Sequence, residues 1–259
     1  MTGELTGRIA IVTGPAKGMG AAVSMALARE GADLVLTGQD TDAIEPVAAD
    51  IAALGRRARI VRCDVTNSAA VDDMAAQAVE FGQGRVDILV NVAGGSGPIE
   101  TPSWETTPDD FDQIVELNMK GCFLTIRAVL PTMMAQRYGK IVNVGGTFGL
   151  RGRALRMAYS ASKWGLRGIT KSIALEVGPF NINVNTVCPG MVEGPRFDRV
   201  CGENAKRLNI GIDEARQRHA EDYALRRIST GDDVANAVVF LASERARQIT
   251  GQDLAIDGG

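Results

Sequence analysis

The amino-acid sequence predicts an α/β protein, a single-domain, Rossmann-like, doubly wound parallel sheet flanked by helices. Three observations predict this fold. Short apolar runs alternate with longer amphipathic stretches from one end of the chain to the other. The apolar runs are mostly continuous, as expected of strands that helices cover on both faces. The connections between successive strands and helices are mostly short, which is typical of a doubly wound parallel sheet.

The first half of the chain is expected to contain four strand–helix steps. A strand is expected at residues 8–13, and the alanine-rich helix expected at 20–30 places Val23 and Leu27 four residues apart on one face. The following strands and helices are expected, in alternating order, at 33–37, 42–54, 59–63, 68–81, 87–90 and 109–136. Each apolar run has the length of a strand, and each stretch between two runs is long enough for a helix.

The second half continues the alternation but contains one long connection. Strands are expected at 140–144, 181–187 and 253–256, and helices at 158–177 and 232–242. The long connection, Glu193–Leu225, lies before the last helix. Connections of this length are usually functional. The sequence has no linker rich in Pro, Gly or Ser and no short-period repeat, so residues 1–259 are interpreted as one domain.

The net charge indicates which classes of partner the protein is expected to bind. Lys and Arg total 28 and Asp and Glu total 31, which gives a net charge of −3. A chain this close to neutrality is not expected to bind nucleic acid or an anionic membrane as its main partner. The start of the chain forms neither a basic nor an apolar targeting segment, and no uninterrupted apolar run is long enough for a membrane-spanning helix. We therefore expect a soluble, cytoplasmic protein.

The cysteine and histidine content argues against a metal site. The four cysteines are far apart in the sequence, so they form neither a metal-type pair nor a dense disulfide framework. The chain has one histidine, His219, which excludes a multi-histidine site. His219 lies among polar residues, and we expect it on a solvated helix face rather than in a catalytic role.

A glycine-rich loop follows the first strand. It reads Thr13-Gly14-Pro15-Ala16-Lys17-Gly18-Met19-Gly20 and opens directly into the first helix. Glycines allow a sharp turn and let a pyrophosphate approach the helix N-terminus, where unpaired N–H groups favour anions. The spacing is Gly-x-x-x-Gly-x-Gly and not the usual dinucleotide Gly-x-Gly-x-x-Gly. Taken alone, the loop also fits a tight strand-to-helix turn.

Further motifs lie near the carboxyl ends of later strands, where a doubly wound sheet binds its ligands. In chain order they are Cys63-Asp64-Val65, Asn91-Val92-Ala93-Gly94, Asn118, Tyr159-Ser160-Ala161-Ser162-Lys163 and Pro189-Gly190-Met191-Val192. Together with the glycine loop, this ordered set resembles the short-chain dehydrogenase/reductase family over essentially the whole chain. The resemblance implies hydride transfer with a nicotinamide dinucleotide and a helical substrate lid near 193–225.

The tyrosine–lysine pair has a chemical rationale of its own. Tyr159 and Lys163 are four residues apart and share one helix face. A phenol is a poor base at neutral pH, and a nearby ammonium makes it a usable proton donor or acceptor by stabilising the phenolate. The resemblance implies that Lys163 also holds the nicotinamide ribose and that Asn118 positions a water in a proton relay. The alternative is that Tyr159 and Lys163 lie on an exposed helix face and that Asn118 only distorts its helix locally.

The chain departs from the family at the catalytic serine. In the family this serine normally lies at the end of the fifth strand, at a set spacing before the tyrosine, and the residue there is Gly146. Glycine has no hydroxyl with which to orient a substrate carbonyl or its developing alkoxide. Thr147 is the nearest hydroxyl, but on a continuing strand it would point to the opposite face. We expect impaired catalysis, with Thr147 as a substitute donor or a donor relocated elsewhere as the alternatives.

The choice of dinucleotide depends on the end of the second strand. The position at which the family places an NAD-selective acid is Gly38, and Gln39 stands where an arginine clamp for NADP is expected. Lys17 fits the basic residue that accompanies a 2′-phosphate, whereas Asp40 could still turn inward. NADP is slightly preferred over NAD. The resemblance implies cofactor contacts from Gly14, Lys17, Gly18, Met19, Gly20, Gly38, Gln39, Asp64, Val65, Asn91, Ala93, Gly94, Tyr159, Lys163, Pro189, Gly190 and Val192.

Three arginines near the expected substrate pocket suggest an anionic substrate. Arg153 and Arg156 precede Tyr159 by six and three residues, and Arg196 opens the 193–225 connection. Guanidinium groups suit carboxylates and phosphates because of their forked donors. Ser96 is the fourth residue assigned to substrate. The alternative is that the arginines form salt bridges to acids of the connection or to a neighbouring subunit.

The sequence is compatible with three functions. The leading hypothesis is an NAD(P)-dependent oxidoreductase that interconverts a secondary alcohol and a ketone. The others are a 3-oxoacyl-thioester reductase and a dinucleotide-binding protein without turnover, which Gly146 favours. A homotetramer is expected from the resemblance and from apolar residues that could exceed one buried helix face, namely Phe123, Ile126, Leu130, Ile169 and Ile173.

Overall fold

The fold is organised around one parallel sheet. The computed structural model describes residues 3–259, so the first two residues of the N-terminal segment considered above lie outside the described part. Across residues 3–259, seven strands pair in the order β3-β2-β1-β4-β5-β6-β7, and the neighbouring strands run parallel. The strands are β1 (Ile9–Thr13), β2 (Asp33–Gly38), β3 (Ala58–Arg62), β4 (Ile88–Asn91), β5 (Gly139–Val144), β6 (Ile182–Pro189) and β7 (Asp253–Ile256). The strand order reverses between β1 and β4, which is where a doubly wound sheet binds ligands.

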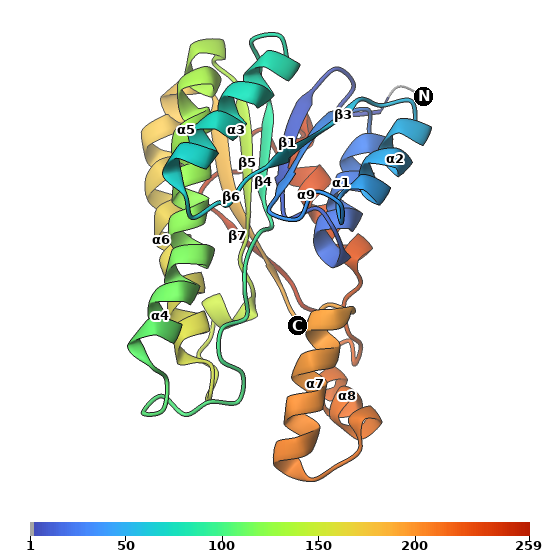
Figure 1. The fold of residues 1–259 in the computed structure, drawn as a ribbon, viewed down its shortest axis with the longest axis vertical. Coiled ribbons are helices and arrows are strands. Elements are labelled where there is room, and N and C mark those ends of the chain that lie inside the picture. Colours follow the sequence, from blue (N-terminus) through green and yellow to red (C-terminus); the bar gives the residue numbers. More distant parts are fainter. Residues whose placement is uncertain (1–2) are drawn as a thin grey trace.

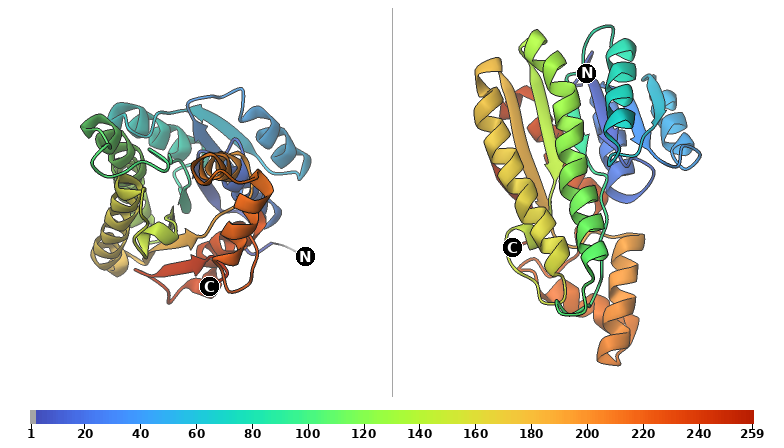
Figure 2. Two further views of the ribbon diagram at one scale, coloured as in Figure 1. Left: turned by 90° about the horizontal axis from the view of Figure 1, so that it is seen from below. Right: turned by 60° about the vertical axis from the view of Figure 1, so that its left-hand side comes forward.

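Helices cover both faces of the sheet (Figures 1 and 2). They are α1 (Gly18–Arg29), α2 (Glu45–Ala53), α3 (Ser68–Phe81), α4 (Pro108–Val115), α5 (Gly121–Gln136), α6 (Met157–Val177), α7 (Pro195–Leu208), α8 (Ile212–Glu221) and α9 (Gly231–Ala242). Helices α1, α2 and α9 bury their apolar residues against one face of the sheet, and α3, α5 and α6 against the other. Successive strand residues supply both cores, since Ala10 and Val12 face the first group of helices and Ile11 faces the second. The predicted doubly wound fold is confirmed, and so is the reason for the continuous apolar runs.

Some predicted helix boundaries were wrong. The helix expected at 42–54 begins at Glu45, because residues 41–44 form a turn and Pro46, which lacks an N–H, fits only within the first helical turn. The single helix expected at 109–136 is two helices, α4 and α5, joined by a π-helical turn at Glu116–Lys120. Asn118 lies in that turn and is completely buried.

The 193–225 connection is helical, as expected. Helices α7 and α8 pack on each other through Phe197, Cys201, Ala205 and Ala215. In Figure 1 this pair projects beyond the carboxyl end of the sheet. The expectation of a solvated His219 was wrong, because α8 turns it toward α7, where its ring packs edge-on against Phe197 with 5.9 Å between ring centroids. Burial, together with the charge of Arg153, lowers the pKa of the His219 imidazole.

Three properties of the described part bear on the expectations from composition. Within residues 3–259, no helix is long and apolar enough to cross a membrane. The same residues contain no group of three or more His, Cys, Asp or Glu side chains placed to hold a metal ion. All four cysteines are buried and unpaired.

Candidate active site

The glycine loop between β1 and α1 lines a cavity of about 280 Å³ that extends to α7. Gly14 and Gly18 have positive φ angles of 67° and 54°, which side chains rarely adopt. A Cβ atom on Gly20 would lie 2.0 Å from the carbonyl oxygen of Gly14, so only glycine lets the helix start this close to the loop. Among residues 3–259, no side chain caps the N-terminus of α1, and the first turn of this helix has no acidic residue. Its free N–H groups therefore suit a phosphate.

The segment after β4 is bonded to the end of β1, and the last residue of β4 is bonded to β5 and α5. The Thr13 hydroxyl accepts hydrogen bonds from the backbone N–H groups of Val92 and Ala93, each at 3.0 Å. The Asn91 side chain faces away from the cavity, donating to Asn143 Oδ1 at 2.9 Å and accepting from the Thr125 hydroxyl at 2.8 Å. Asn91 is thus placed to hold β4 against β5 beneath the site rather than to line it.

Tyr159 and Lys163 meet at the floor of the cavity, on the first turns of α6. Lys163 is buried, and its Nζ donates to the carbonyl oxygen of Val144 at 2.9 Å. The same Nζ lies 5.8 Å from the centre of the Tyr159 ring. Phe148 packs edge-on against Tyr159, with ring centroids 6.3 Å apart. The pair is therefore an internal feature of the site and not an exposed helix face.

Asn118 contributes to this site through hydrogen bonds to neighbouring residues. Its Oδ1 accepts from the Gly95 N–H at 2.8 Å, and its Nδ2 donates to the Ser162 hydroxyl at 3.1 Å. A Cβ on Gly94 would lie 2.8 Å from Asn118 Oδ1 and 3.8 Å from Lys163 Nζ, which shows how closely these residues converge. The π-helical turn brings the Asn118 side chain inward. Asn118 is therefore both the helix distortion and a buried part of the site.

Gly146 occupies the place opposite the tyrosine hydroxyl. Strand β5 ends at Val144, and a Cβ built on Gly146 would lie 3.2 Å from Tyr159 Oη. The backbone of Gly146 has a φ of 155°, outside the range that side chains usually adopt. Thr147 begins a 3₁₀ turn, Thr147–Gly149, and lines the same cavity. The strand geometry that would have turned Thr147 to the opposite face has ended by this point.

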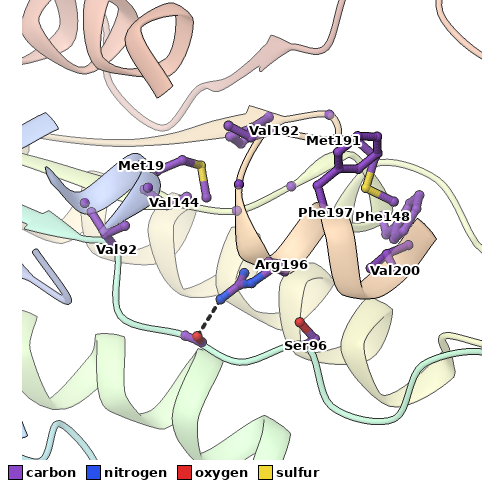
Figure 3. Close-up of a pocket in the computed structure, with 18 of the residues that line it drawn as sticks. Met19, Val92, Ser96, Val144, Phe148, Met191, Val192, Arg196, Phe197 and Val200 are labelled. Atoms are coloured by element: carbon purple, nitrogen blue, oxygen red, sulfur yellow. Dashed lines mark hydrogen bonds between the residues drawn. The ribbon is translucent and has the colours of Figure 1, made fainter. Parts of the chain in front are cut away.

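Only two of the three predicted arginines reach the cavity. Arg156, at the N-terminus of α6, is buried and its Nη2 donates to the carbonyl oxygen of Ser96 at 3.0 Å. Arg196, on α7, donates to the carbonyl oxygen of Gly94 at 2.7 Å across the cavity (Figure 3). Arg153 does not line the cavity, because it turns toward Asp222, 3.8 Å away, and lies over the ring of Phe148. The expectation that Arg153 walls the pocket was wrong.

The cavity brings together most of the predicted residues. Those that line it are Gly14, Lys17, Gly18, Met19, Gly20, Ala93, Gly94, Ser96, Gly146, Thr147, Arg156, Tyr159, Lys163, Pro189, Gly190, Val192 and Arg196. Those that do not are Gly38, Gln39, Asp64, Val65, Asn91, Asn118 and Arg153. Sequence reasoning missed an apolar wall made by Phe148, Met191, Phe197 and Val200. The spacing of Phe197 and Val200, three residues apart in a helix, was the available signal.

The end of β2 carries no inward acid. The Asp40 carboxylate accepts a hydrogen bond from the Ala43 N–H at 3.2 Å and so belongs to the turn before α2. Gly38 pairs in register with Arg62 at the end of β3. Lys17 and Arg62 are both exposed, and neither forms an ion pair within residues 3–259. Arg62 was not anticipated from the sequence, because only strand pairing places it beside Gly38.

Comparisons with known proteins agree with this geometry. Residues 14–259 match the model of a family described as enoyl-(acyl carrier protein) reductase. A short-chain dehydrogenase/reductase of Armillaria gallica is 37% identical over 257 residues, which cover 98% of this chain and 95% of that protein. A D-beta-hydroxybutyrate dehydrogenase of Cupriavidus necator is 34% identical over 259 residues, covering 98% of each.

Solved structures match over nearly the whole chain. A structure of NAD⁺-bound xylitol dehydrogenase superposes with a TM-score of 0.93 at 30% identity, covering 98% of this chain and 99% of the other. A variant of actinorhodin polyketide ketoreductase with NADPH also gives a TM-score of 0.93 at 30% identity, covering 100% and 98%. These two structures hold different dinucleotides, and their names point to chemically different substrates.

Proposed function

The chain belongs to the short-chain dehydrogenase/reductase family, and we propose that it interconverts a secondary alcohol and a ketone with a nicotinamide dinucleotide. One observation carries the proposal. Tyr159, Lys163 and residue 146 converge on a single cavity that continues into the glycine loop. A proton donor is thereby held next to a dinucleotide cradle, which is the arrangement that hydride transfer to a carbonyl requires.

The residues of the loop fit a dinucleotide. The uncapped start of α1 offers N–H groups to the pyrophosphate, and the close contact of Gly20 with Gly14 leaves the loop without side chains at that point. Lys163, Gly190 and Val192 line the far end of the same cavity, where the nicotinamide and its ribose would be held. When bound, the nicotinamide supplies the hydride chemistry.

The protein itself supplies the proton and the orientation. The Tyr159 hydroxyl gives its proton to the carbonyl oxygen in reduction and takes it back in oxidation. The buried Lys163 ammonium, held by Val144, stabilises the phenolate that forms. Asn118 accepts a hydrogen bond from Gly95, and Thr13 accepts one from Ala93, so two hydrogen bonds hold the segment after β4 in place. The position facing the phenol has no hydroxyl, and we expect a correspondingly slow reaction.

The test of this function separates binding from turnover. The purified protein should bind NADP⁺ or NAD⁺, measured by calorimetry, and should reduce that nucleotide in the presence of a panel of secondary alcohols. A rate well below that of ordinary dehydrogenases is the expected result. Nucleotide binding with no turnover on any alcohol would favour the third hypothesis, a dinucleotide-binding protein without catalysis.

We also propose a preference for NADP over NAD. Arg62 presents an exposed cation beside the end of β2, Lys17 presents another at the start of α1, and Asp40 is engaged in its own turn. Cations in these positions suit a 2′-phosphate, whereas a free carboxylate would repel it. The ratio of the two dissociation constants tests the preference.

A 3-oxoacyl-thioester reductase is the second candidate. The apolar wall of Phe148, Met191, Phe197 and Val200 favours it, because an acyl chain would pack there. Turnover of a 3-oxoacyl thioester at a rate far above that of simple ketones would establish this alternative. A dependence of turnover on a free carboxylate in the substrate distinguishes the two, since a thioester has no free carboxylate at that position.

A homotetramer is proposed from the exposed apolar residues of α5 and α6. Of the residues named from the sequence, Ile126 is fully buried and Leu130, Ile169 and Ile173 pack against the core, so only Phe123 supports the expectation. Trp164 and Leu175, which are 49% and 83% exposed on α6, add to it. Exposed residues of this size on neighbouring helices favour association with another copy.

A further inference from the structure

Arg156 is a buried cation in the wall of the active-site cavity. It is 8% exposed, and its guanidinium carbon lies 4.9 Å from the centre of the Tyr159 ring. Burial lowers the pKa of this guanidinium. Within residues 3–259 no carboxylate forms an ion pair with it, because Glu100, the acid that acts on it, pairs with Arg207. A buried charge without a counter-ion is unfavourable, and an oppositely charged partner offsets that cost.

The Arg156 guanidinium also has N–H donors that no residue of the described part accepts from. Arginine carries five N–H donors, and Nη2 uses one on the carbonyl oxygen of Ser96. The Nε atom is buried and has no partner in the described part of the chain. A buried donor without a partner is costly unless an acceptor arrives. An oxyanion is therefore the ligand that we expect the Arg156 guanidinium to bind, and the forked arrangement of its donors suits a carboxylate.

We propose that the substrate is a 2- or 3-hydroxy acid, or the matching oxo acid, whose carboxylate binds Arg156. This assignment rests on the proposed function, in which the Tyr159 hydroxyl contacts the reacting oxygen. Because the guanidinium stacks on the ring that carries this hydroxyl, the carboxylate and the reacting carbon are separated by few bonds. In a 2- or 3-hydroxy acid, one or two carbon–carbon bonds of about 1.5 Å each separate the carboxylate carbon from the reacting carbon.

The rest of the cavity accepts a hydrocarbon group. Phe148, Met191, Phe197 and Val200 gather on one side of the cavity (Figure 3). The other arginine of the cavity, Arg196, is exposed and already donates a hydrogen bond to the carbonyl oxygen of Gly94, so it lies at the rim of the cavity. The substrate is therefore charged at the end next to Arg156 and apolar at the end next to α7.

The experiment compares an acid with its neutral ester. The probes are 2- and 3-hydroxyhexanoate and their methyl esters, with NADP⁺ and NAD⁺ as oxidants. Arg156→Met should lower kcat/KM for at least one of the acids about 100-fold and change that for its ester less than threefold. Arg153→Met is the matched control, because Arg153 lies outside the cavity, and it should change neither value more than threefold. Arg156→Lys should recover part of the lost activity on the acid.

A binding measurement makes the proposal independent of turnover. Calorimetry on the protein saturated with dinucleotide should show tighter binding of the acid than of the ester by more than tenfold. Arg156→Met should abolish this difference while leaving the dinucleotide dissociation constant unchanged, which also reports that the variant is folded. Acid binding without turnover would reject the proposed function and keep this inference.

Two results would overturn the carboxylate assignment. In the first, the wild-type protein binds or oxidises the esters as well as either acid. In the second, Arg156→Met lowers kcat/KM for acid and ester by the same factor, which would mean that Arg156 serves the reacting oxygen or the fold. Either result is compatible with turnover of neutral alcohols and so leaves the proposed function standing.

Discussion

Restoring a hydroxyl at residue 146 is the most direct test of the catalytic assignment. A Cβ at this position would lie 3.2 Å from Tyr159 Oη, so a serine there would bring its hydroxyl to the atom that handles the proton. A single donor to a developing oxyanion is worth about 10²–10³ in kcat, or roughly 2.7–4 kcal/mol. Gly146→Ser should therefore raise kcat at least about tenfold, a conservative part of that effect.

The backbone sets the cost of this substitution. The φ of 155° falls just short of the extended region that any residue adopts, so the new side chain must shift the backbone. Strained conformations of this kind cost about 1–3 kcal/mol. In a chain of this length, each kcal/mol lowers Tm by roughly 2–4 °C. Gly146→Ser is expected to be more active and less stable than the wild-type protein.

Gly146→Ala is the matched control, because it introduces the same Cβ and the same strain without the hydroxyl. Steady-state rates from nicotinamide absorbance, with Tm from calorimetry, give both quantities for the three proteins. The serine variant should exceed the alanine variant by about 10²–10³ in kcat. Equal rates for the two variants would refute the reasoning. Loss of activity in Thr147→Ala, with little change in Gly146→Ser, would instead assign the donor to Thr147.

The remaining predictions concern the proton step, the choice of dinucleotide and the assembly. Tyr159→Phe should lower kcat by at least about 100-fold, the scale of general acid–base catalysis, while the dinucleotide dissociation constant stays within threefold; an unchanged kcat would remove Tyr159 from the proton step. Lys17→Ala combined with Arg62→Ala should weaken NADP⁺ binding about tenfold and leave NAD⁺ binding unaltered in calorimetry, whereas equal weakening of both would contradict the 2′-phosphate assignment. Light scattering should report a mass near four chains, which Trp164→Glu should reduce; a stable monomer at micromolar concentration would reject the tetramer.

The fold was predictable because its determinants are local. Continuous apolar runs such as residues 9–12 and 88–90 reflect burial on both faces of the sheet. The glycine loop was also predictable, since Gly14 and Gly18 adopt conformations that few other residues tolerate. The order of the motifs along the chain then indicated the family before any contact was known.

Other features of the site depend on contacts between distant segments. The π-helical turn that buries Asn118 forms where α4 and α5 meet the segment after β4, and the helical periodicity of residues 109–136 does not reveal it. His219 was expected to be solvated because its neighbours in the sequence are polar, yet α7 covers it.

The sequence by itself determined the parallel sheet, the dinucleotide loop, the tyrosine–lysine pair and the missing hydroxyl at residue 146. Only the tertiary structure decided which arginine enters the cavity. Arg153 and Arg156 are three residues apart and chemically identical. Arg156 contacts Ser96 and Tyr159 in the cavity, whereas Arg153 contacts Asp222 and Phe148 outside it. The physical reason is that a long side chain has many rotamers of similar energy, and the partners that select one of them come from other parts of the chain.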